Sequence, residues 1–228
     1  MTPAPSIGTV LSRIGETQAP LPAAVAVLIG LAAVVTVGIQ EIWLFLQHAN
    51  TIAHEGAHAI AGSGVGRKVR GVTLSKNGDG LTAVDSGGAA GDILFYFVGY
   101  LGPSAFGLGA ARLIKVGHSV AVLWLALFLL ILLLVVLRKA FSYMPVLIVA
   151  GLIYLIVRYG SVGANTAAAY GVTWFLLLSG VRKVIDHGSK AVDAGKLVEI
   201  TRLWRWTWVW LWMAGSITAL VVGGMLLV

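Results

Sequence analysis

The chain contains no cysteine and few charged residues. Without cysteine, disulfide frameworks, iron–sulfur clusters, cysteine nucleophiles and cysteine-ligated zinc are all excluded, so His, Asp or Glu must hold any metal. Only 11% of the 228 residues are charged, whereas soluble domains average roughly 25%. Together with 58% hydrophobic residues and a mean hydropathy of +0.92, this shortage excludes a water-soluble globule and indicates a membrane protein.

Apolar segments long enough to cross a hydrocarbon core of about 30 Å recur along the chain. They cover residues 21–40, 42–62, 89–111, 119–137, 141–158, 164–181 and 204–227. One straight helix over the first two would be about 60 Å long at 1.5 Å per residue, so we expect a break between them. The sequence therefore predicts an all-α polytopic membrane protein with about six to seven transmembrane helices. We expect residues 1–20 to form a flexible tail and residues 21–228 to form one membrane-embedded domain.

The net charge of +7 is typical of cationic loops that stay on the cytoplasmic side of a membrane. No dense basic run is present, and we expect no nucleic-acid partner. With seven spans and a cytoplasmic N-terminus, thirteen Lys and Arg residues fall on one side and three on the other. This bias predicts that the N-terminus and residues 66–84 both face the cytoplasm.

Residues 66–84 are too polar to span the membrane and have an alternating pattern. Two β-prone stretches flank an Asn77-Gly78-Asp79-Gly80 turn signal. Alternation around an Asn-Gly turn is typical of a β-hairpin. We therefore predict a short hairpin on the cytoplasmic side, directly after the segment at 42–62.

The segment at 42–62 contains the motif His54-Glu55-Gly56-Ala57-His58. Residues four apart share one face of a helix, so both imidazoles can bind one zinc ion. Glu55 lies beside them, where it can act as the general base that takes a proton from a zinc-activated water. This face also carries other polar residues at spacings of three and four, namely Gln47, Asn50 and Thr51. Because such a stripe is costly against lipid, we expect it to face protein or a water-filled cavity.

Other metal chemistries fit only part of this motif. A carboxylate-bridged di-iron site needs a second Glu-x-x-His, and Glu16, Glu41 and Glu199 are not followed by one. Haem held by two His needs suitably placed partners, which the other three His do not offer. A mononuclear site with His and carboxylate ligands remains.

Several segments resemble the site-2 protease family of intramembrane zinc metalloproteases, and its compact bacterial branch most closely. These segments are HEGAHAIAG at 54–62, GRKVRGVTLS at 66–75, GYLGPSAFG at 99–107 and the late Asp193-Ala194. The resemblance implies a Zn²⁺ cofactor, a transmembrane protein or peptide substrate, and a bacterial cytoplasmic membrane with the active-site end in the cytoplasm. It also implies hydrolysis of peptide bonds in or near transmembrane segments.

A catalytic zinc needs a third protein ligand and a position left for water. The carboxylates available are those of Asp79, Asp85, Asp92, Asp186 and Asp193. Asp186, Asp193 and Asp92 fall at the membrane face nearest the two His. The resemblance favours Asp193, in Asp193-Ala194-x-x-Leu197, with Asp186 as the alternative.

We therefore predict a zinc metalloendopeptidase in which His54, His58 and Asp193 bind the metal and Glu55 is catalytic. The alternative is a membrane scaffold or pseudoprotease that keeps a structural metal site. The presence of Glu55 favours the enzyme, because a purely structural site needs no base. Substrate-binding residues are not identified by the sequence.

Overall fold

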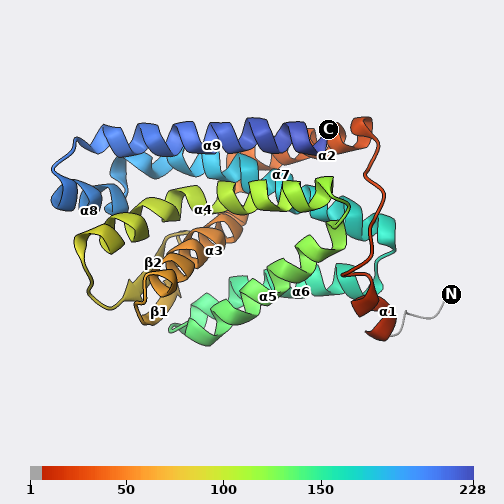
Figure 1. Cartoon of the computed structure of the whole chain (residues 1–228), viewed down its shortest axis with the longest axis horizontal. Coiled ribbons are helices and arrows are strands. Elements are labelled where there is room, and N and C mark those ends of the chain that lie inside the picture. The colour runs from red at the N-terminus through yellow and green to blue at the C-terminus, as the bar shows by residue number, and fades with distance from the viewer. Residues whose placement is uncertain (1–6) are drawn as a thin grey trace.

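A computed structural model describes residues 7–228, which form a bundle of helices with a small β-hairpin at one end (Figure 1). The helices before the hairpin are α1 (Ile7–Ser12), α2 (Ala23–Gly38) and α3 (Gln40–Gly64), and the strands are β1 (Val69–Leu74) and β2 (Gly80–Val84). After the hairpin come α4 (Ala89–Lys115), α5 (Ser119–Val136), α6 (Ala140–Tyr159), α7 (Val162–His187), the 3-10 turn η1 (Gly188–Lys190), α8 (Val192–Thr201) and α9 (Arg205–Leu227). The predicted fold class is confirmed.

Five helices, α4, α5, α6, α7 and α9, are each long and apolar enough to cross a membrane. Helices α2 and α3 pass the same test only together, and they meet at an angle of 101°. Ile39 separates them with an extended backbone, close to the break predicted at residues 40 and 41. A bent pair counted as one span gives six crossings, the lower of the two numbers predicted.

The two ends of α5 show which parts of the chain share a side of the bundle. Before α5, Gly117 accepts a backbone hydrogen bond from Gln18 at 2.7 Å. After α5, Arg138 donates its backbone N–H to Val72 of the hairpin at 3.0 Å. The N-terminal segment and the hairpin therefore lie at opposite ends of the bundle, and α2 and α3 together cross it once. This corrects the predicted topology, which counted two crossings there and placed the N-terminus beside the active-site end.

One buried residue, Gln18, attaches the otherwise mostly exposed N-terminal segment to the bundle. Residues 7–12 form α1, and the Gln18 side chain is buried. Its amide donates to the backbone oxygens of Arg13 and Glu16 at 3.1 and 2.6 Å, and its oxygen accepts from the N–H of Val120 at 3.0 Å. These bonds hold the segment against the start of α5, so the predicted flexible tail does not extend over residues 7–20. Residues 1–6 lie outside the described part of the chain.

The hairpin predicted at residues 66–84 is present. Its strands pair antiparallel, with Val72 opposite Thr82, and Gly78 takes a φ of +85° in the turn, a conformation that favours glycine. Val72 is fully buried, which anchors β1 to the core. The turn lies on the polar side of α3, where the Thr51 hydroxyl donates to the Gly78 oxygen at 2.6 Å. The hairpin thus covers the helix that carries the HEGAH motif.

Candidate active site

The polar stripe predicted on α3 is buried inside the protein. Its members at positions 47, 50, 51, 54, 55 and 58 are all buried, and Asn50 is fully so. Asn50 donates from its side-chain amide to the Ser179 hydroxyl of α7 at 2.9 Å. Helices α4 and α7 and the hairpin therefore provide the surroundings that this stripe needs in a lipid bilayer.

Three predicted ligand atoms converge at the end of this stripe. The Nε2 atoms of His54 and His58 are 3.1 Å apart. Asp193 Oδ2 lies 3.3 Å from the first and 3.2 Å from the second. In a tetrahedral zinc site with ligands at about 2.0–2.1 Å, neighbouring ligand atoms are separated by roughly 3.3 Å. The spacing therefore fits a single metal ion.

The chemistry of the three atoms also fits a cation. His58 Nδ1 donates to the Phe95 backbone oxygen at 2.8 Å, so in a neutral ring Nε2 presents a lone pair to the other two atoms. Burial works to raise the pKa of Asp193, but the hydrogen bonds and charges of His54 and His58 hold it well below the usual range. When both rings are neutral and Asp193 is ionised, the three atoms form the kind of ligand set that binds a divalent cation.

Residues of α4 and α9 form a second layer around the His pair. A side-chain carbon at Gly99 would overlap His58 Nε2, so only glycine allows α4 this close. The Tyr100 ring meets the His54 ring edge-on, with centroids 4.9 Å apart. Trp212 stacks on Tyr100 at 4.4 Å and donates its indole N–H to the Phe97 oxygen at 2.8 Å. Trp212 of α9 thus supports the orientation of the His54 ring through Tyr100.

The predicted base, Glu55, is held by the hairpin. Its carboxylate oxygen Oε2 accepts a hydrogen bond from the Thr82 hydroxyl at 2.6 Å. The other oxygen lies against Gly80, where a side-chain carbon would overlap it. Both Glu55 and Thr82 are buried. The hairpin therefore fixes the Glu55 carboxylate and covers it from bulk water on that side.

The other carboxylates considered as ligands lie elsewhere. Asp186, the alternative, accepts from Arg182 on its own helix at 2.7 Å. Asp92 pairs with the buried Arg67 at 2.5 Å, and Asp85 pairs with Arg70. Across residues 7–228, the His, Asp and Glu side chains close enough to share one metal are those of His54, His58 and Asp193.

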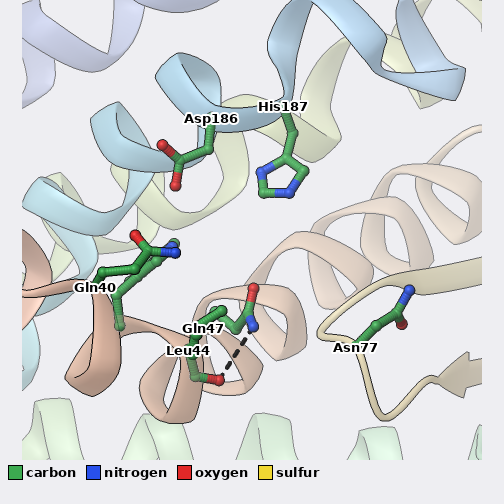
Figure 2. A pocket seen from close by; sticks show the side chains of 7 residues that line it. Gln40, Leu44, Gln47, Asn77, Asp186 and His187 are labelled. Atoms are coloured by element: carbon green, nitrogen blue, oxygen red, sulfur yellow. Dashed lines mark hydrogen bonds between the residues drawn. The ribbon is translucent and has the colours of Figure 1, made fainter.

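A polar cavity of about 320 Å³ opens near the other end of the stripe (Figure 2). Gln47 of α3, Asn77 of the hairpin turn, and Asp186 and His187 at the end of α7 surround it. Asp186 therefore faces this cavity and does not join the His pair. The cavity can hold water or polar groups where α3, α7 and the hairpin meet.

Sequence patterns did not indicate the contacts of Thr82, Tyr100 and Trp212. Five Trp residues alternate along 204–212, and three of them are exposed: Trp204, Trp206 and Trp210. Trp208 and Trp212 are buried instead. From Trp212 on, α9 buries a residue every three or four positions, but its exposed positions are apolar as well, so the sequence carries no local signal for the role of Trp212.

The comparisons with known proteins give one family and no individual relative. No curated protein and no solved structure matches the chain. The Peptidase M50B-like family model matches residues 25–223, which include all three converging ligand residues and Glu55. This match supports the predicted resemblance to site-2 proteases and protease activity in general. With its helical bundle, its apolar spans and this match over most of its length, the chain belongs to the Peptidase M50B-like family of membrane metallopeptidases.

Proposed function

We propose that the protein is an intramembrane zinc endopeptidase that hydrolyses peptide bonds in or near transmembrane segments of other proteins. The observation that supports this most strongly is the meeting of His54, His58 and Asp193 within 3.1–3.3 Å of one another. The residue next to His54 is a buried glutamate, which a structural metal site would not need. The scaffold alternative gains no comparable support.

In this proposal His54, His58 and Asp193 hold the metal. Zinc, when bound, supplies Lewis-acid activation of a water molecule and of the scissile carbonyl. Glu55 takes the proton from the attacking water, and it then gives a proton to the leaving amine. The Thr82 hydroxyl keeps the Glu55 carboxylate oriented for both transfers. The Phe95 oxygen and the Tyr100 ring keep the two imidazoles aligned.

A substrate helix must unwind before its peptide bonds can be reached, and we propose that the hairpin binds the unwound segment by edge pairing. β1 has β2 on one side and an isolated bridge from Val72 to Leu137 on the other. Within the described chain β2 has one strand partner, so its outer edge is available for pairing. Proline replacements over residues 81–83 that left cleavage intact would count against this step.

The charge distribution supports a cytoplasmic location for the active-site end. The hairpin end carries twelve Lys and Arg residues: Arg67, Lys68, Arg70, Lys76, Arg138, Lys139, Arg182, Lys183, Lys190, Lys196, Arg202 and Arg205. The other end carries Arg13, Arg112, Lys115 and Arg158. The native chain has no cysteine, so an Asn77→Cys variant tests this directly. An impermeant thiol reagent should label it only from the cytoplasmic side, and labelling from the opposite side would refute the orientation.

Metal analysis of matched variants tests the proposed function. Wild type should bind about one zinc per chain, and Asp193→Asn should lose it. Asp186→Asn removes the same charge from a carboxylate outside the cluster and should keep the metal. Glu55→Gln should keep zinc but lose cleavage of a tagged single-span peptide with a helix-breaking Gly-Pro pair. A wild-type protein that binds no zinc in metal-replete buffer would refute the mechanism.

A further inference from the structure

The proposed mechanism gives no role to Lys183, a buried residue of α7. Its exposed fraction is 6%. Within residues 7–228, no hydrogen bond or ion pair joins its ammonium group to another side chain, whereas the adjacent Arg182 pairs with Asp186. A largely buried charge without an ion-pair partner is unfavourable. In a membrane protein such a residue is a candidate functional group.

The position of Lys183 on α7 directs its side chain toward the active-site helix. Ser179, one turn earlier on the same face, accepts the hydrogen bond from Asn50 of α3. His187, one turn later, lines the cavity shown in Figure 2 together with Gln47 of α3. Lys183 lies between these two contacts. Lys183 therefore lies on the side of α7 that faces α3 and the hairpin turn.

Three carboxylates act on the Lys183 charge, and Glu55 is among them. Asp79 in the hairpin turn has the largest effect, followed by Glu55 and then Asp186. None of them forms an ion pair with Lys183 in the described structure. The Lys183 charge is therefore close enough to the proposed base for the two to interact electrostatically.

We propose that Lys183 is a substrate-binding residue whose ammonium group donates a hydrogen bond to a carbonyl oxygen of the bound peptide. This rests on the proposed function. An unwound segment exposes carbonyl groups that have lost their helical partners, and the ammonium group of a lysine offers three donors to them. The surrounding carboxylates disfavour a free anion as ligand and favour a neutral peptide oxygen. That oxygen belongs either to the scissile bond, where negative charge develops, or to a neighbouring peptide.

Three variants test the proposal on the full-length protein in detergent. Lys183→Met keeps the length of the side chain and removes its charge, and Lys183→Arg keeps a charged donor. Lys190→Met makes the same change as the first at an exposed lysine of η1 and serves as the matched control. Zinc content, thermal stability, kcat and KM are measured with the tagged single-span peptide.

Lys183→Met should keep its zinc and lose about 10- to 1,000-fold in kcat/KM. Lys183→Arg should recover part of this loss, and Lys190→Met should match wild type. A loss confined to kcat assigns the contact to the scissile carbonyl, and a loss confined to KM assigns it to a neighbouring peptide.

Unchanged kcat/KM in Lys183→Met would overturn the proposal and leave the proposed function intact. Recovery of activity in Lys183→Met combined with Asp79→Asn would also overturn it, because Lys183 would then only balance the Asp79 charge. A wild-type protein that binds zinc and cleaves no peptide would refute the proposed function itself, and the role of Lys183 with it.

Discussion

The hydrogen bond from Thr82 to Glu55 allows a quantitative prediction. Replacement of Thr82 by valine keeps the shape of the side chain and removes the hydroxyl that lies 2.6 Å from the carboxylate. A hydrogen bond to a charged group contributes about 1.5–3 kcal/mol. With about 1.4 kcal/mol for each factor of ten, full loss of that orientation lowers kcat by roughly 10- to 150-fold. KM and zinc content should change little, since Thr82 does not contact the metal-ligand cluster.

The assay is steady-state cleavage of the tagged single-span peptide, with zinc content and thermal inactivation measured on the same samples. Thr73→Val is the matched control, because Thr73 lies in β1 of the same hairpin, opposite Leu81, and makes no contact with Glu55 in the described structure. Thr82→Ser should recover most of the activity. Wild-type kcat in Thr82→Val, or an equal loss in Thr73→Val, would refute the argument that the hairpin positions the base.

Two further substitutions test the second layer around the His pair. Gly99→Ala should weaken zinc binding at least tenfold in a chelator competition, since the added carbon overlaps His58 Nε2, whereas Gly109→Ala, which meets open space, should bind zinc like wild type. Trp212→Phe should keep the stack on Tyr100 but lose the bond to the Phe97 oxygen, which lowers stability by about 1 kcal/mol. Thermal inactivation checks the second prediction, and a variant as stable as wild type would contradict it.

The features that depend on local patterns could be predicted from the sequence. The spans follow from apolar length, the hairpin from alternation around Asn77-Gly78, and the buried face of α3 from the spacing of its polar residues. The placement of Asp193 depended on family resemblance, because no local pattern connects it to His54. The structure brings the two within 3.3 Å, and metal analysis is the test of their shared role.

The features that depend on long-range packing could not be predicted. The turn between α2 and α3 has an extended Ile39 and no Gly-Pro pair, so composition did not show that two apolar segments make one bent crossing. The prediction that the N-terminus and the active-site end share one side was wrong for this reason. Thr82 and Trp212 reach the site through contacts with distant segments, and their own surroundings in the sequence carry no sign of it.

The proposed zinc ligands are synthesised at widely separated times during translation. His54 and His58 are made early, whereas Asp193 follows 135 residues after His58, on a helix that precedes only the last span. Because chains emerge from the ribosome N-terminus first, the nascent protein carries the base and two ligands through the insertion of most of its helices. It lacks the third ligand throughout that time. On the proposed mechanism, peptidase activity therefore cannot arise before α8 is in place.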